Sequence, residues 1–158
     1  MRVHASHNIR LRPVVREDLE ALYAMQSDPA SNEMAGTKPR TREVFFSVWK
    51  LHFANPDING CVIELEDGGG RRVVGSIACF QAVEGDAGPR DCVGYWIARE
   101  WWGRGVASRA LALFLERETR RPLHATAARS NVRNRARSRF TFVLIAPSVS
   151  ASRAASSR

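Results

Sequence analysis

The stretch that decides the fold reads D-C-V-G-Y-W-I-A over Asp91–Ala98, E-W-W-G-R-G-V-A over Glu100–Ala107 and S-R-A-L-A-L-F-L-E-R-E-T over Ser108–Thr119. The first part predicts a strand. The last part predicts a helix, because its apolar residues fall on one stripe: Ala107, Ala110, Leu111, Phe114 and Leu115. A strand that passes through a glycine-containing loop into a helix points several backbone N–H groups at one place, where the helix dipole adds about half a positive charge. The stretch therefore predicts an anion-binding loop, with an ordinary tight turn as the alternative.

The glycines of this loop favour a phosphate ligand. Gly103 and Gly105 have no Cβ atom, so an anion can approach the backbone, and Arg104 and Arg109 add positive charge. Dinucleotide binding is disfavoured, because G-x-G-x-x-G would need glycine at Ser108, and the Walker pattern G-x-x-x-x-G-K-[ST] is absent.

The remaining sequence predicts a mixed α/β domain with the order β-α-α-β-β-β-α-β and no internal repeat. Thr41 can cap the second helix, and the glycines of Asp67–Gly70 suit a tight antiparallel hairpin. The expected elements are a strand at Asn8–Val14, a helix from Glu17 to Gln26, a loop at Ala30–Arg40, a helix at Thr41–Phe53, strands at Cys61–Glu66, Arg72–Phe80 and Asp91–Ala98, a helix at Ser108–Thr119 and a strand at Leu123–Ala127.

Length and composition narrow the class of protein. The 158 residues and 44% apolar content are typical of one domain with one core. No apolar run approaches the roughly 20 residues of a membrane span, and no secretory signal begins the sequence, so we expect a soluble, cytoplasmic chain. The three cysteines and four scattered histidines lack metal-ligand spacing, which predicts buried thiols and no metal site.

The net charge of +8 comes from the end of the sequence. Residues 1–120 contain 16 Lys and Arg and 16 Asp and Glu, whereas residues 121–158 contain eight Arg and no acidic residue. Nucleic-acid binding through these arginines is an unfavoured hypothesis, because only Phe140 and Phe142 could stack on bases there.

Several motifs together resemble the GNAT-type N-acyltransferases, in particular the subgroup that includes ribosomal-protein and small-molecule N-acetyltransferases. The resemblance runs from about Ile9 to Asn134. The family's loop pattern [Q/R]-x-x-G-x-[G/A] falls on Trp102–Ala107, with Trp in the first place. The other matching motifs are I-R-L-R-P-V-V-R-E-D-L, S-D-P, V-V-G-S-I, V-G-Y-W-I, W-W-G-R-G-V-A-S-R-A-L and L-H-A-T-A-A-R-S-N.

The resemblance implies a mostly antiparallel central sheet flanked by helices and a site for acetyl-CoA as co-substrate. The pantetheine arm would pair with the backbone of Ile97 and Ala98, where two parallel strands splay apart, and Asn131 would hold it. The pyrophosphate would bind the amides of Gly103, Arg104, Gly105, Val106, Ala107 and Ser108. The acetyl group would pass directly to a primary amine, either a small molecule or a protein N-terminus. Asp91 is the candidate base, with a solvated carboxylate at the strand end as the alternative.

The end of the sequence departs from this family. Asn134 stands where Ser is expected, no glycine follows Gly105, and the usual last strands and their tyrosine are missing. We expect a GNAT-like domain at residues 1–140 and a basic Ser/Ala-rich tail at 141–158 whose end is disordered. A shifted or truncated reading frame is the favoured explanation, and a genuine basic arm is the alternative. An incomplete sheet leaves an open edge, which keeps a homodimer open as a hypothesis. A catalytically impaired acyl-CoA-binding or interaction protein is the alternative function.

Overall fold

The structure is a computed structural model that describes residues 8–83 and 89–117, apart from the side chains of residues 81–83 and 89–92. Short 3₁₀ helices at Arg16–Asp18 and Arg99–Trp101 precede α1 and the loop before α4. The other elements are β1 (Asn8–Pro13), α1 (Leu19–Gln26), α2 (Pro29–Ala35), α3 (Arg42–Ala54), β2 (Asn59–Asp67), β3 (Gly70–Val83), β4 (Pro89–Ile97) and α4 (Val106–Arg117). The predicted strand Leu123–Ala127, Asn131 and the predicted tail lie outside the described residues.

The four strands form one antiparallel sheet in the order β1-β2-β3-β4. This confirms the predicted hairpin, in which Asp67 pairs with Gly70, and Gly70 adopts the left-handed φ of 113° that the turn requires. The register shifts between Ile63 and Glu64, so that Val74 is an extra residue on β3. The described part therefore has the mixed architecture, with an antiparallel sheet and flanking helices, that the sequence predicted.

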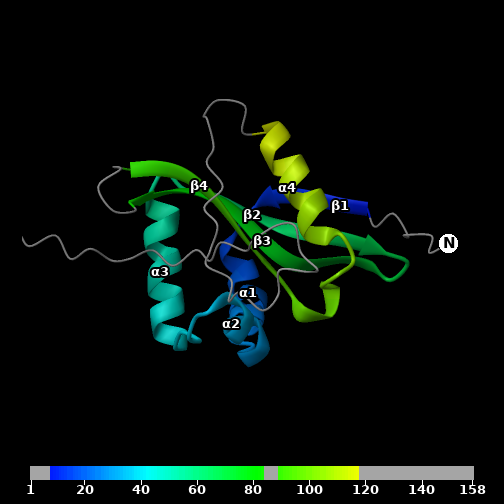
Figure 1. Cartoon of the computed structure of the whole chain (residues 1–158), viewed down its shortest axis with the longest axis horizontal. Helices are drawn as coiled ribbons and strands as arrows, with labels where there is room; N and C mark the ends of the chain where they lie inside the picture. Colours follow the sequence, from blue (N-terminus) through cyan, green and yellow to red (C-terminus); the bar gives the residue numbers. More distant parts are fainter. Residues whose placement is uncertain (1–7, 84–88, 118–158) are drawn as a thin grey trace, which may run out of the picture.

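The helices cover both faces of the sheet. Figure 1 shows α1, α2 and α3 on one side and α4 on the other. On the α4 side, Val106, Ala110 and Phe114 pack on strand residues that include the buried Cys61 and Cys79. On the opposite side, Leu22, Phe45 and Trp49 pack on Val62. Burying these apolar faces is the main force that holds the helices to the sheet.

The prediction of a loop at Ala30–Arg40 is wrong for the first half of that range, because Pro29–Ala35 forms α2. The signals of this helix lie at its ends. Pro29 occupies the first turn, the Asp28 carboxylate accepts the Ser31 N–H at 2.9 Å, and Gly36 ends the helix with a φ of 69°. A helix of seven residues is too short to show a clear apolar period. The predicted Thr41 cap is confirmed, since its hydroxyl accepts the Val44 N–H.

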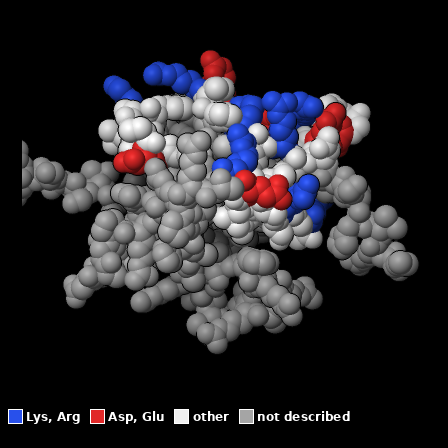
Figure 2. All heavy atoms as spheres, turned by 90° about the horizontal axis from the view of Figure 1, so that it is seen from above, with Lys and Arg blue, Asp and Glu red and all other residues white. Residues whose placement is uncertain are grey.

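Charges of both signs are distributed over the surface. Residues 8–83 and 89–117 contain 14 Lys and Arg and 13 Asp and Glu. In the view of Figure 2, basic and acidic side chains lie among one another on the described part of the molecule. No helix in this part is long and apolar enough to cross a membrane. This part of the chain thus carries no large excess of either charge.

A buried ion pair fixes α1 against the first two strands. Both terminal nitrogens of Arg12 on β1 donate to the buried Asp18 carboxylate at 2.7 Å, and the Arg12 Nε donates to Glu64 on β2 at 2.7 Å. Asp18 also accepts the Val15 N–H at 2.9 Å. Burial opposes ionisation of Asp18, but the hydrogen bonds from Arg12 and Val15 and the charge of Arg12 outweigh it and lower the pKa of this carboxyl.

We expect Asp18→Asn to lower the free energy of unfolding by about 2 kcal/mol at neutral pH, since charged hydrogen bonds of Arg12 are lost. Because the folded pKa of Asp18 lies below its unfolded value, this stabilisation is present above about pH 4 and is lost as the pH falls through the folded pKa. Urea unfolding at pH 7 and at several acidic pH values would measure the difference. Glu20→Gln, which removes the exposed partner of Arg42, is the control and should have a much smaller effect. A constant difference between Asp18→Asn and the parent chain at all pH values would contradict the assignment.

Candidate active site

The loop before α4 has the backbone geometry of an anion site. Gly103 and Gly105 both adopt left-handed φ angles, 69° and 78°, and a Cβ atom built at either glycine meets nothing within 4 Å. The carbonyl of Gly105 accepts the Arg109 N–H at 3.1 Å, so the helix hydrogen bonds begin there. The N–H groups from Gly105 to Ser108 therefore have no acceptor within the helix. Open space above a glycine loop and a helix dipole together suit a phosphate group.

Two tryptophans hold this loop. Trp101 is buried, and the guanidinium of Arg104 lies 4.9 Å from the centre of its ring. The Trp102 indole N–H donates to the Ile97 carbonyl at 2.8 Å. The Trp102–Ile97 hydrogen bond ties the start of the loop to the last residue of β4. The glycines are thus held at a fixed position relative to the strand end.

The end of β4 is itself fixed by β3. The Ala98 N–H donates to the carbonyl of Val74, the extra residue of the bulge, at 2.8 Å. A Cβ atom on Gly75 would lie 2.2 Å from the Trp96 carbonyl oxygen, so only glycine fits there. The predicted cofactor residues Ile97, Ala98 and Gly103–Ser108 lie on the segment that begins at this fixed strand end.

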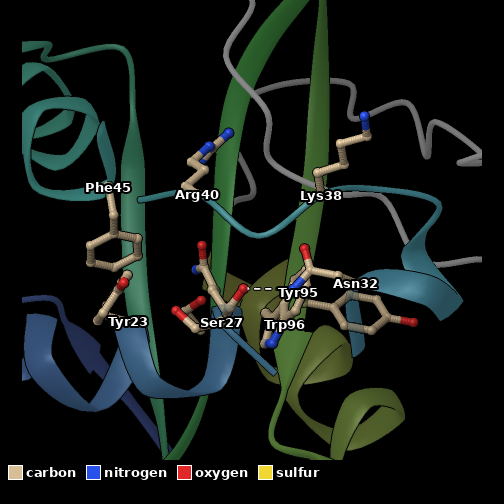
Figure 3. A pocket seen from close by; sticks show the side chains of 10 residues that line it. Tyr23, Ser27, Asn32, Lys38, Arg40, Phe45, Tyr95 and Trp96 are labelled. Carbon is tan, nitrogen blue, oxygen red and sulfur yellow. Dashed lines mark hydrogen bonds between the residues drawn. The ribbon is translucent and has the colours of Figure 1, made fainter. Parts of the chain in front are cut away.

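A pocket of about 30 Å³ lies beside β4. Figure 3 shows its labelled side chains, which come from α1, from α2 and the segment after it, from α3 and from β4. The lining residues are Tyr23, Gln26, Ser27, Asn32, Lys38, Arg40, Phe45, Ser76, Tyr95 and Trp96. A volume of this size can hold a small polar group, because one water needs roughly 10–15 Å³. Trp96 of β4 lines the pocket, and the next residue, Ile97, accepts the hydrogen bond from Trp102 that holds the glycine loop.

Hydrogen bonds order the polar wall of the pocket. The Asn32 side-chain N–H group donates to the carbonyls of Gln26 and Asp28, at 2.8 and 2.9 Å, and its oxygen accepts the Thr37 hydroxyl at 3.0 Å. The Trp96 indole N–H donates to the Met25 carbonyl at 3.1 Å. These bonds fix the end of α1 and the start of α2 against β4. Burial raises the pKa of the Tyr95 hydroxyl, so this group stays protonated at neutral pH.

The structure does not describe the side chains of the two remaining predicted site residues, Asp91 and Asn131. The backbone of Asp91 pairs with Gln81 in the sheet, and its side chain is outside the description. Asp91 precedes Ile97 by six residues, which corresponds to about 20 Å along a strand. Asn131 lies outside the described residues. The roles of Asp91 and Asn131 stay predictions.

Motif analysis of the loop missed most of the pocket residues. Tyr23, Asn32 and Ser76 lie on three separate elements, and only packing brings them together. The one feature of the sequence that could have pointed to the pocket is the segment between α1 and α3. This segment supplies Asn32, Lys38 and Arg40. No motif in that segment marks these residues individually.

Comparison with solved structures identifies the class of fold. A domain from Methanocaldococcus jannaschii is 24% identical with a TM-score of 0.57, over 76% of this chain and 77% of that one. An N-acetyltransferase from Staphylococcus aureus Mu50 is 21% identical with a TM-score of 0.56, over 75% of this chain and 72% of that one. Spermidine N-acetyltransferase from Vibrio cholerae, solved with CoA and spermine, is 16% identical with a TM-score of 0.55, over 68% and 62%. The chain therefore has the fold of N-acetyltransferases.

The family follows from the sequence match. The model described as "Acetyltransferase (GNAT) domain" matches residues 8–141, so the chain belongs to this family. GNAT acetyltransferases use acetyl-CoA as co-substrate, which agrees with the predicted cofactor. A comparison with curated protein sequences gave no significant match.

We expect Trp102→Phe to weaken acetyl-CoA binding about fivefold, because the indole N–H that ties the loop to Ile97 contributes roughly 1 kcal/mol. Calorimetric titration of each variant with acetyl-CoA would measure the change in Kd. Trp49→Phe is the control: Trp49 is buried in the core between α3 and the sheet, away from the loop, and its replacement should leave Kd nearly unchanged. Equal losses in both variants would show that the loop is not specifically positioned by Trp102.

Proposed function

We propose that this chain binds acetyl-CoA on the loop before α4 and transfers its acetyl group to a primary amine held in the pocket beside β4. The observation that carries this proposal is the pair of left-handed glycines, Gly103 and Gly105, with open space above both. They lie just before α4, whose first N–H groups have no helical acceptor, and a short 3₁₀ helix separates them from the strand that lines the pocket. Membership of the GNAT family supports the same reaction.

The residues fit the two ends of this co-substrate. The amides from Gly103 to Ser108 would hold the pyrophosphate, with Arg104 at the mouth of the loop. The backbone of Ile97 and Ala98 would hold the pantetheine arm. Asn131 would complete this contact, as the family resemblance implies. The phosphate end would thereby lie at the helix and the thioester end near Trp96.

The reaction needs the amine and the thioester in contact. Acetyl-CoA supplies a thioester whose carbonyl carbon the neutral amine attacks. One C–N bond forms, the C–S bond breaks, and overall one proton passes from the nitrogen to the sulfur. No covalent intermediate on the protein is required. Positioning alone contributes several kcal/mol in well-oriented reactions, so a fixed strand end between the two sites suits this chemistry.

Asp91 remains the proposed base, although its distance along β4 limits how it can act. A carboxylate about six residues from Ile97 could take the amine proton only through water or through an extended acceptor. The proposed acceptors are a small-molecule amine and a protein N-terminus, the two classes that the predicted subgroup implies.

The proposal is tested by titrating the protein with acetyl-CoA and by following CoA release with amines. We expect binding by the parent chain and an affinity about tenfold weaker in Gly103→Ala and Gly105→Ala, because each Cβ fills the open space above the loop. Gly36→Ala is a matched control, since Gly36 has the same φ of 69° and open surroundings but lies at the end of α2. Its backbone strain should be similar and its effect on acetyl-CoA affinity small.

Absence of binding at millimolar acetyl-CoA would overturn the proposal. Binding without thioester consumption over a broad amine panel would instead select the alternative, a catalytically silent acyl-CoA-binding protein. Equal weakening in Gly36→Ala would mean that backbone strain, and not lost ligand space, explains the glycine variants.

A further inference from the structure

A second cleft lies between α3 and the start of α1 with the 3₁₀ turn before it. Its volume is about 280 Å³, and it is lined by Arg16, Leu19, Phe46, Lys50 and Phe53. Helical spacing explains much of this lining, since Phe46, Lys50 and Phe53 follow one another at intervals of four and three residues on α3. None of the five residues lines the pocket beside β4. The cleft is therefore separate from the proposed acetyl-transfer site.

The apolar wall of this cleft is partly open to solvent. Leu19 is buried and Phe46 is half-buried, whereas Phe53 is 41% exposed. An apolar cavity of about 150 Å³ can hold a benzene ring, so a cleft of about 280 Å³ has room for the apolar part of a small molecule. A ligand that covers Phe53 removes apolar surface from water on both sides of the contact, which favours binding.

The two polar residues of the lining are both cations. Arg16 and Lys50 are exposed, and neither forms an ion pair with a carboxylate in the described part of the chain. The guanidinium carbon of Arg16 lies 6.0 Å from the centre of the Phe53 ring, next to the apolar wall. Contact with a ring uses the face of a guanidinium, so the N–H donors in its plane stay available to an anion.

The acidic side chains nearest in sequence are bound elsewhere. The carboxylate of Asp18 accepts two hydrogen bonds from Arg12, and Glu20 on α1 pairs with Arg42. No described Asp or Glu lines the cleft. A cationic ligand would therefore meet two like charges there, whereas an anionic group beside the apolar wall would meet two opposite charges.

We propose that this cleft binds a small anionic amphiphile, an alkyl carboxylate of medium chain length. Its chain would lie against Leu19, Phe46 and Phe53, and Arg16 and Lys50 would bind its carboxylate. The size of the cleft favours a free small molecule over a protein, because a stable protein interface buries roughly 1,200 Å² or more in total and the cleft offers five lining residues. The proposal does not depend on acetyl transfer.

The test is a calorimetric titration of the full chain with octanoate, 1-octanol, octylammonium and acetate. The first three share an alkyl chain and differ in the head group, and acetate has the carboxylate without the chain. We expect saturable binding of octanoate, with a Kd at least tenfold lower than that of 1-octanol. Octylammonium should bind more weakly than 1-octanol, because it would meet Arg16 and Lys50, and acetate should not saturate the site.

Charge variants locate the carboxylate. Arg16→Gln with Lys50→Gln should reduce the preference for octanoate over 1-octanol to less than about threefold. The matched control is Arg10→Gln with Arg71→Gln, which removes the same net charge from exposed positions on β1 and the β2–β3 hairpin and should keep the preference.

Apolar variants locate the chain. Phe53→Ala should weaken octanoate and 1-octanol by similar factors, because it shortens the wall that both chains contact. Leu51→Ala is the control: Leu51 is 59% exposed on another face of α3 and should not affect either ligand. Circular dichroism would verify the fold of each variant, and the charge variants decide the question if Phe53→Ala does not fold.

Absence of saturable binding at millimolar octanoate would overturn the proposal, as would equal affinities for octanoate and 1-octanol. Retention of the preference in the Arg16 and Lys50 double variant would also overturn it, because other residues would then bind the carboxylate. Self-association of the chain that Phe53→Ala abolishes would show that a second copy covers the cleft, which again contradicts a small-molecule site. Each of these outcomes leaves the proposed acetyl transfer unaffected.

Discussion

The close approach of β3 and β4 at Gly75 is the constraint on which the site depends. A methyl group there would overlap the Trp96 carbonyl, 2.2 Å from the added carbon, and would press on Ile97 at 3.1 Å. Because the strands meet so closely, the Ala98 N–H reaches the Val74 carbonyl beyond the regular pairing. The bulge at Val74 turns this carbonyl toward the end of β4. Backbone contacts thus fix the point at which the chain leaves the sheet, and few side-chain changes could alter them.

From this fixed strand end, the segment after β4 places the loop. The short 3₁₀ turn carries Trp101 into the core and Trp102 back onto the Ile97 carbonyl. Each tryptophan anchors one side of the turn, so the two left-handed glycines that follow need no contacts of their own. Glycines at such positions cost chain entropy on folding and gain only backbone freedom and open space. Their presence beside two anchoring tryptophans is typical of a loop shaped for a ligand rather than for packing.

Sequence patterns predicted the parts of this arrangement that local chemistry determines. The two loop glycines, the Thr41 cap and the hairpin at Gly70 each have a backbone reason that is visible in a few residues. The bulge at Val74 and the seven-residue helix α2 were not predicted, because strand register depends on pairing partners and a short helix shows little periodicity. The pocket was beyond sequence reasoning for a related cause: Tyr23 and Ser76 become neighbours only when α1 packs on the sheet. The actions of Asp91 and Asn131 remain predictions.

Trp96 and Ile97 at the end of β4 face opposite sides of the sheet, so one strand contributes to both sites, and Tyr95, which belongs to the same core cluster as Ile97, also lines the pocket. Ile97 belongs to the core beneath α4, and its carbonyl holds the loop, whereas the preceding Trp96 lies on the α1 side and bonds to Met25. Ser76, which pairs with Trp96 across the sheet, lines the same pocket. Successive residues of a strand point to opposite faces, so a shift of one residue in register would exchange the two environments. The bulge at Val74 and the close approach at Gly75 are features of the observed register, in which the pocket and the glycine loop lie next to the end of β4.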